Sequence, residues 1–349
     1  MTADPRPVLL VTNVVAPDRA GAFHALHERE GLQLALFGGR SHHATGQVDD
    51  LDLPHTDIGQ RDAYRLAASG AYRAVIAGTA GRAALPAAYL GARRSRTPFL
   101  LWTALWAHPR TPAFALAGTP LLNHLYKHAD AVITYGSHVS RFVAARDAKN
   151  VHVAPQAVDV AFWSAPATAP ERPPHAEFVA LNVGRPARYK GLPELREAWR
   201  ATGFAAPAEQ LVLVGDGTPV GAQPPERLRN FYAGADVLVM SAVATRDFLE
   251  PWGLVANEAM HQRLPVIATT AVGAAAGGLV RHERNGLVVP SGDAAALAGA
   301  LGRLRTDRPL RERLGAQAHD DAAAHTYAAW AAGVSDALVS VGAGAGGDR

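Results

Sequence analysis

Short apolar runs rich in valine, leucine and isoleucine alternate along the chain with longer stretches rich in alanine and leucine. A continuous apolar run of this kind is typical of a strand buried on both faces of a sheet. The predicted strands are residues 8–15, 31–37, 72–77, 98–102, 131–134, 177–183, 210–214, 235–240, 264–269 and 286–289, and the predicted helices include 81–91, 293–304 and 309–325. This alternation predicts βαβ units and parallel sheets.

A stretch rich in proline and alanine, residues 163–176, separates the two sets of strands. It has no periodicity, which is typical of a linker or a domain edge. We therefore predict an α/β fold with two Rossmann-like parallel-sheet domains, 1–165 and 166–325, followed by a terminal helix and flexible tail, 326–349. Because ligands of parallel sheets bind beyond the carboxyl ends of the strands, the two domains are expected to face a cleft that holds the ligand.

Composition narrows the class of protein. Hydrophobic residues make up 48% of the 349 residues and charged residues 19%, which is typical of a globular protein. The net charge of +3 is spread out, so we expect no nucleic-acid partner, and the lack of cysteine excludes disulfides and thiolate metal sites. Without a long apolar segment or a leader pattern, the expected location is the cytoplasm. The run Arg93, Arg94 and Arg96 could contact an anionic membrane surface, or it could be a solvated helix end.

Two loops that follow predicted strands have residues suited to a phosphate. Arg185 and Lys190 lie five residues apart just beyond the strand at 177–183. Arginine offers a planar fork and lysine a mobile charge, which together suit a pyrophosphate, although both could be solvated loop cations. Gly215 and Asp216 begin a glycine-rich turn after the strand at 210–214, where backbone can approach a ligand. An ordinary strand-to-helix turn is the alternative.

The segment 248–260 contains two acids, Glu250 and Glu258, on either side of Gly253, Leu254 and Val255. The backbone N–H groups of these three residues are expected at a helix N-terminus, where they can hold phosphate or sugar oxygens. Glu258 is expected about two turns into the helix. A glycosidase pair needs ~5–9.5 Å between its carboxyl groups, whereas one continuous helix would separate these acids by ~12 Å, so that alternative requires Glu250 to lie in a turned loop. A third alternative is that both acids are surface residues.

The order of these motifs resembles glycosyltransferase family 4, the large family of retaining GT-B enzymes. The resemblance covers residues 130 to 320 best. Its motifs are Gly184-Arg185 with Lys190-Gly191, Val214-Gly215-Asp216-Gly217, Ala235-Asp236-Val237, Glu250 with Glu258-Ala259-Met260, Leu264-Pro265-Val266 and Asn285-Gly286-Leu287.

The resemblance implies a role for each matching residue. Glu250 would contact the donor sugar, Glu258 the ribose hydroxyls, and Arg185 and Lys190 the diphosphate, with the backbone at 253–255 and 215–216 completing the donor site in the second domain. The acceptor would bind the first domain. Many relatives have a sugar-facing histidine after a strand of that domain. His108 lies near the equivalent point, shifted in position, and is a candidate catalytic residue; a surface or helix-capping histidine is the alternative.

The resemblance implies retaining transfer of a sugar from a nucleoside diphosphate sugar to a hydroxyl acceptor, in glycan, lipid-linked saccharide or natural-product biosynthesis. The leaving diphosphate would take the acceptor proton. We expect no metal ion, because the acidic run 49–52 lies in a polar loop of the first half of the chain, away from the expected donor site. The cations Arg185 and Lys190 would take the place of the metal at the diphosphate. The alternatives are a nucleotide-sugar epimerase or a phosphorylase on the same fold, and a non-catalytic two-domain protein that binds a nucleotide sugar.

Overall fold

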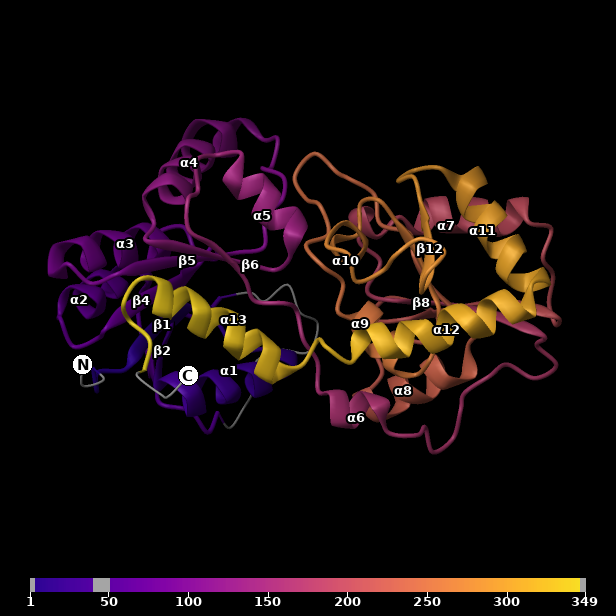
Figure 1. The fold of residues 1–349 in the computed structure, drawn as a ribbon. Helices are drawn as coiled ribbons and strands as arrows, with labels where there is room; N and C mark the ends of the chain where they lie inside the picture. Colours follow the sequence, from indigo (N-terminus) through magenta and orange to yellow (C-terminus); the bar gives the residue numbers. More distant parts are fainter. Residues whose placement is uncertain (1–3, 40–50, 346–349) are drawn as a thin grey trace. The chain divides into compact units, whose positions relative to one another are not determined.

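The computed structural model describes residues 4–39 and 51–345, so the acidic run 49–52 lies partly outside the described residues. The chain divides into two compact units. Unit 1 comprises residues up to Trp106, Pro112–Ala157 and the chain from Thr326 on, and unit 2 comprises Ala107–Thr111 and Val158–His325. Each unit is built on a parallel sheet with helices, which confirms the predicted fold class (Figure 1).

Unit 1 has a seven-stranded sheet in the order β3-β2-β1-β4-β5-β6-β7, and every neighbouring pair is parallel. Its strands are β1 (Val8–Thr12), β2 (Leu32–Leu36), β3 (His55–Asp57), β4 (Ala74–Gly78), β5 (Phe99–Thr103), β6 (Ala131–Thr134) and β7 (Val151–Val153). Its helices are α1 (Pro17–Glu30), α2 (Ala63–Ala68), α3 (Ala84–Ser95), α4 (Thr119–His128), α5 (Ser137–Ala144) and α13 (Tyr327–Ser340), with a 3₁₀ turn at Gln60–Asp62 and a π-helical turn at Phe114–Gly118. The strand order reverses direction between β1 and β4, which is the position where parallel sheets bind ligands.

Unit 2 has a five-stranded parallel sheet in the order β12-β11-β10-β8-β9. Its strands are β8 (Phe178–Val183), β9 (Glu209–Val214), β10 (Val237–Met240), β11 (Val266–Thr269) and β12 (Gly286–Val289). Its helices are α6 (Val160–Ser164), α7 (Leu192–Ala201), α8 (Pro225–Gly234), α9 (Val255–His261), α10 (Gly273–Ala276), α11 (Ala294–Thr306) and α12 (Arg308–Ala322), with a 3₁₀ turn at Arg188–Lys190.

The last helix, α13, packs on unit 1 beside α1, although unit 2 precedes it in the chain (Figure 1). Trp330 lies 5.6 Å from Phe23 and 5.7 Å from Trp102, measured between ring centroids. A side chain at Gly333 would place its Cβ 2.2 Å from the Val153 carbonyl oxygen, so only glycine permits this close approach to β7. The helix α13 is therefore packed into unit 1.

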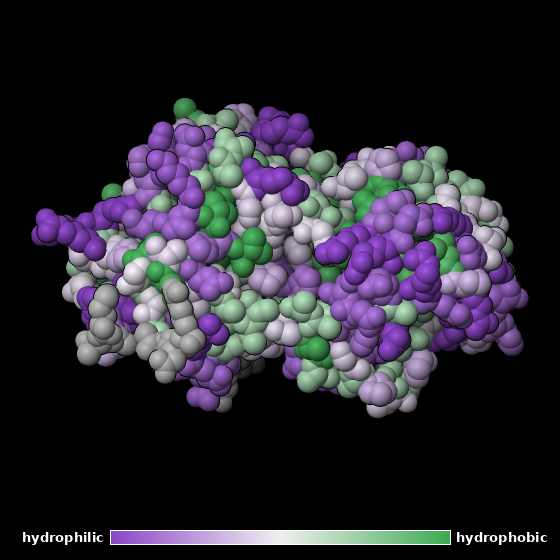
Figure 2. Space-filling model, in the orientation of Figure 1, coloured by the Kyte–Doolittle hydropathy of each residue, from purple (hydrophilic) through white to green (hydrophobic). Residues whose placement is uncertain are grey.

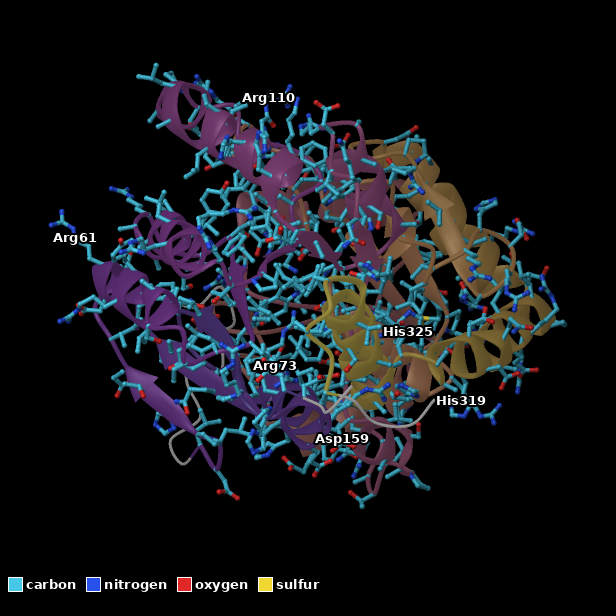
Figure 3. The ribbon with its side chains drawn as sticks, turned by 60° about the vertical axis from the view of Figure 1, so that its left-hand side comes forward. Arg61, Arg73, Arg110, Asp159, His319 and His325 are labelled. Atoms are coloured by element: carbon cyan, nitrogen blue, oxygen red, sulfur yellow. The ribbon has the colours of Figure 1, made fainter. Side chains whose placement is uncertain are left out.

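A buried arginine, Arg73, which is labelled in Figure 3, bonds the segment that follows α13. It forms a 2.7 Å ion pair with Glu30, whose carboxylate also accepts a hydrogen bond from the Ala345 amide. It donates a second hydrogen bond to the Ala343 carbonyl at 2.8 Å. Breaking one partner of such a buried pair is costly, because the other charge is left in the interior.

The proline-rich stretch 163–176 packs on unit 2 and begins within it, since the structural division falls between Ala157 and Val158. Trp163 is buried against Tyr232, and Gln262 donates a hydrogen bond to the Ala165 carbonyl at 3.0 Å. Farther on, the Glu171 amide bonds the Asn230 carbonyl at 2.9 Å. Apart from the short segment Ala107–Thr111, which groups with unit 2, the chain passes between the units at two places, Ala157–Val158 and His325–Thr326.

Three histidines lie near the second of these passages. His261 on α9 is buried, hydrogen-bonded to Ser164, and 6.2 Å from His319 on α12 between ring centroids. His325 faces Trp252 at a centroid distance of 6.0 Å, and both it and His319 are labelled in Figure 3. Burial, together with the nearby His319 and His325, lowers the pKa of His261 to about 4.

Exposed large hydrophobic side chains are scattered over the described residues, with Leu116 the most exposed at 83%. On the face seen in Figure 2, apolar patches are small and separated by hydrophilic surface. No helix among the described residues is long and apolar enough to cross a membrane.

Candidate functional site

The carboxyl ends of β8 and β9 are held close together by two glycines. These strands are paired with Val183 opposite Val214, so Gly184 and Gly215 follow side by side. The Gly184 amide donates a hydrogen bond to the Val214 carbonyl at 2.8 Å. A Cβ atom on Gly215 would lie 2.5 Å from the Gly184 carbonyl oxygen, and its φ of 141° also favours glycine. The two glycines therefore allow the ends of these strands to approach each other closely.

Lys190 lies at the end of a 3₁₀ turn that leads from this edge into α7. Gly191 follows with φ 65°, and a Cβ atom there would lie 1.9 Å from the Ser241 carbonyl oxygen. Ser241 in turn donates its hydroxyl hydrogen to the Lys190 carbonyl at 2.9 Å. The turn is therefore fixed against the end of β10, and this contact sets the position of the lysine.

Lys190 and Glu250, sixty positions apart in the sequence, form an ion pair of 2.6 Å between Nζ and Oε2. Their side chains are 19% and 10% exposed, so the pair is partly shielded from water. Glu250 is positioned by its backbone, whose carbonyl accepts a hydrogen bond from the Gly273 amide at 3.1 Å. The structure thus brings together the two residues expected to contact the diphosphate and the donor sugar.

Five other predicted residues lie in loops that follow strands of this sheet or at the start of α9. Arg185 follows Gly184 directly and is half-buried, and Asp216 follows Gly215 and is exposed. Gly253 has φ 91°, and a Cβ there would lie 2.3 Å from the Met240 Cε, so this position also needs glycine. Leu254 caps α9 and Val255 begins it. By contrast, Arg188 between the two cations points to solvent and pairs with Glu194 at 2.9 Å.

Glu258 lies in the first turn of α9, since the helix begins at Val255. The expectation that it lies two turns into a helix was wrong, because the chain from Glu250 to Gly253 is a loop. Glu250 is therefore not on the same helix as Glu258, and the ~12 Å separation of a continuous helix does not apply.

A tyrosine that the sequence did not single out holds Glu258. The Tyr232 hydroxyl donates a 2.6 Å hydrogen bond to Oε2 of Glu258. Tyr232 is completely buried on α8, and burial together with the nearby carboxylate raises its pKa well above the usual value. The phenol stays protonated, so it is a permanent donor to this carboxylate.

His108 lies in a short segment of the first half of the chain that groups with unit 2. The Arg110 amide donates to the Arg246 carbonyl at 2.6 Å, and Arg246 Nε donates to the Arg110 carbonyl at 2.8 Å. These bonds hold the segment on the loop that precedes Glu250. In that loop the ring of Phe248 packs on Tyr189, with 4.4 Å between centroids.

Among the described residues, no group of three histidine, aspartate or glutamate side chains could hold a metal ion.

Comparison with known proteins gives a consistent result. Residues 218–321 match the family model for glycosyl transferases group 1, a region that contains Glu250 and Glu258. The chain is 38% identical over 112 residues to the D-inositol 3-phosphate glycosyltransferase of Nocardia farcinica, covering 32% of this chain and 23% of that one. It is 33% identical over 181 residues to the lipopolysaccharide core biosynthesis glycosyltransferase LpsE of Rhizobium meliloti, covering 47% and 48%. The matches thus span about a quarter to a half of these relatives.

Solved structures resemble nearly the whole chain. The HepE protein of Anabaena in complex with UDP and glucose gives a TM-score of 0.76 at 17% identity, covering 96% of this chain and all of that one. Sucrose-phosphate synthase of Thermosynechococcus elongatus gives 0.65 at 20% identity, covering 97% and 99%. At this identity the likeness shows the fold alone. Together with the family match, it supports a glycosyltransferase of the GT-B fold.

Proposed function

We propose that this chain transfers a sugar from a nucleoside diphosphate sugar to a hydroxyl acceptor, with retention of configuration, as expected for glycosyltransferase family 4. The observation that carries the proposal is the Lys190–Glu250 ion pair beside the glycine backbone at Gly184 and Gly215. It combines a cation suited to a diphosphate with an acid suited to sugar hydroxyls, at the edge where parallel sheets bind ligands. HepE, with a similar fold, has been crystallised with UDP, with UDP-glucose, and with UDP and glucose.

In this mechanism the protein acts by position and charge. As the bond between sugar and phosphate breaks, negative charge grows on the leaving diphosphate oxygen, which takes the proton of the acceptor hydroxyl. In this proposal Lys190 and Arg185 stabilise the charge on that oxygen, and a group that gains more from the transition state than from the ground state lowers the barrier. Glu250 orients Lys190 and contacts the donor sugar.

The nucleoside would be held by the Glu258 carboxylate, which accepts hydrogen bonds from the two ribose hydroxyls. Tyr232 occupies one side of Oε2 and so fixes the rotation of this carboxylate. The exposed Asp216 and the turn at Gly215 are placed beside the end of β8, where the base would lie. No metal is needed in this scheme, because the two cations offset the diphosphate charge.

A screen of nucleotide sugars by thermal shift, followed by product analysis with candidate hydroxyl acceptors, tests this proposal. A ligand that binds only the folded state raises the melting temperature, so the screen identifies base and sugar together. Binding should be weakened by Lys190→Met and unchanged by Arg188→Met, whose exposed side chain pairs with Glu194. Stabilisation by a nucleotide sugar without turnover with any acceptor would favour a non-catalytic binding protein, and the absence of any stabilisation would refute the donor site.

Contact with a membrane surface remains part of the proposal for a lipid-linked acceptor. Arg93 pairs with Asp130 at 3.3 Å, which offsets part of the basic charge at this helix end, whereas Arg94 and Arg96 are exposed. Sedimentation with anionic and neutral lipid vesicles tests whether the acceptor is lipid-linked or soluble. A protein that acts at an anionic membrane surface should sediment with the anionic vesicles and not with the neutral ones.

A further inference from the structure

Two aromatic rings lie against each other next to the Lys190–Glu250 ion pair. Tyr189 directly precedes Lys190 in the 3₁₀ turn, and Phe248 comes shortly before Glu250 in the loop after β10. The ring centroids are 4.4 Å apart with an interplanar angle of 47°, and both side chains are partly buried. The Nζ atom of Lys190 lies 5.4 Å from the centroid of the Tyr189 ring, within the range of a cation–π contact. The two loops that carry the ion pair are therefore joined by a second contact, between rings.

The backbone around Phe248 forms a turn that is closed by its own hydrogen bonds. The Thr245 amide donates to the Phe248 carbonyl at 3.0 Å, and the Phe248 amide donates to the Thr245 hydroxyl oxygen at 3.0 Å. The hydroxyl of Thr245 also donates to the Phe248 carbonyl at 2.9 Å. Arg246, inside this turn, is bonded in both directions to Arg110, which is labelled in Figure 3. The Phe248 ring is thus attached to a backbone that is held at several points.

Tyr189 is held from the other side by the same loop. Its carbonyl accepts a hydrogen bond from the Val243 amide at 2.8 Å, just beyond the end of β10. The loop after β10 therefore contacts the 3₁₀ turn twice, through the backbone at Val243 and through the ring of Phe248. The ring contact is the one that adjoins Glu250 in the sequence, so it relates the position of this acid to that of Lys190.

A lysine needs such support if its charge is to have a defined position. Its ammonium is carried on a flexible four-carbon stem, so one ion pair leaves it considerable freedom. A displacement of about 1 Å in a catalytic site can cost about 10²-fold in rate. The Tyr189 ring lies beside the Lys190 ammonium, and the Phe248 ring packs on the Tyr189 ring. The Tyr189 hydroxyl forms no hydrogen bond with any residue that the structure describes, so the contact depends on the ring alone.

We propose that Tyr189 and Phe248 are positioning residues, whose ring contact holds the Lys190 ammonium and the Glu250 carboxylate in the geometry that the reaction requires. This inference rests on the proposed glycosyl transfer, in which Lys190 stabilises the leaving diphosphate and Glu250 contacts the donor sugar. The rings act through these two side chains and do not contact the reacting atoms. Their effect on turnover should therefore disappear when the charge that they position is absent.

Donor turnover by the full chain tests this proposal with the variants Tyr189→Phe, Tyr189→Ala and Phe248→Ala. Each alanine variant should lower kcat about tenfold or more and change the donor KM less, because a misplaced charge loses most of its effect in the transition state. Tyr189→Phe should keep kcat near wild type, since it retains the ring. The matched control is Trp199→Ala, which breaks another ring pair of unit 2, Trp199–Phe204, with 5.2 Å between centroids. It should lower the free energy of unfolding and leave kcat unchanged.

Combination with Lys190→Met separates positioning from general structural support. In the Lys190→Met background, Phe248→Ala should lower kcat by no more than about twofold, because residues that act as a unit are not additive. A loss of kcat that is as large in this background as in wild type would overturn the proposal. A large fall of kcat in Tyr189→Phe would also overturn it, because the hydroxyl would then contact a substrate. Tyr189→Leu and Phe248→Leu remove the ring and keep an apolar side chain, so they carry the same test if an alanine variant does not fold.

Urea unfolding of the same variants distinguishes this inference from the proposed function. If the rings hold the ion pair together, Lys190→Met should destabilise the Phe248→Ala variant less than it destabilises wild type. If wild type transfers no sugar from any nucleotide sugar, the proposed function fails, and this comparison decides alone: unequal effects support the ring contact, and equal effects refute it. If wild type is active and both alanine variants retain kcat, the positioning role fails, whereas Lys190→Met still tests the donor site.

Discussion

Replacing Lys190 by methionine tests the donor site most directly. The change removes an ammonium 2.6 Å from the Glu250 carboxylate and keeps the length of the side chain. At this distance and an effective dielectric constant of ~20, the gross attraction is about 6 kcal/mol. Most of it is offset by the desolvation of both ions, but removing one partner leaves the other charge behind at a cost of ~3–5 kcal/mol when buried. Because Lys190 is 19% exposed, we expect the lower end, about 3 kcal/mol of unfolding free energy.

The effect on catalysis should differ from the effect on stability. Loss of a preorganised charge beside the leaving group typically lowers kcat by ~10²–10³. The double variant Lys190→Met with Glu250→Gln removes both charges, so it should recover most of the lost stability while turnover stays low. Arg188→Met should change stability by about 0–1 kcal/mol, since its pair with Glu194 is at the surface, and should leave kcat near wild type.

Urea unfolding and donor turnover of the four proteins measure these effects. If Lys190→Met retains kcat while Arg188→Met loses it, the diphosphate site is wrongly assigned. If the double variant is no more stable than Lys190→Met, the ion pair is not the source of the destabilisation.

Three further predictions follow from the same structure. Tyr232→Phe should raise the donor KM about tenfold with little change in kcat, because its 2.6 Å hydrogen bond orients a carboxylate that binds the ground and transition states alike. Glu258→Ala removes that carboxylate and should raise the donor KM further. A fall in kcat at constant KM would argue against this role. The pKa of His261 is lowered to about 4 from its usual 6.5, so the unfolded chain binds more protons below pH 6.5. The stability due to neutral His261 is therefore complete above pH 6.5 and is lost as pH falls toward 4. The melting temperature should decline over this pH range, and the decline should be smaller in His261→Asn. Turnover should survive EDTA, and full loss restored by manganese would refute a metal-free mechanism.

The buried parallel strands were predictable because each is a continuous apolar run. The predictions at 131–134 and 286–289 coincide with β6 and β12. The edge strands β3 (His55–Asp57) and β7 (Val151–Val153) were missed. β3 is fully exposed and polar, and each has only three residues, so neither has the apolar pattern that identifies a strand.

The site was predictable as a set of residues but not as a set of contacts. Lys190 and Glu250 each follow a strand of one parallel sheet, so their placement at a common edge follows from fold alone. The hydrogen bond between Tyr232 and Glu258 does not, because it depends on how α8 packs beside α9.

The return of α13 to unit 1 fixes an order in which the chain can complete its folding during synthesis. Unit 2 is almost entirely contiguous and has its sequence once His325 has been made. Unit 1 at that moment still lacks Trp330, so the faces of Phe23 and Trp102 that contact it are open to water. The domain synthesised first is therefore the last to close its core, and its α1 face is the apolar surface that a nascent chain must protect from aggregation until the final helix emerges.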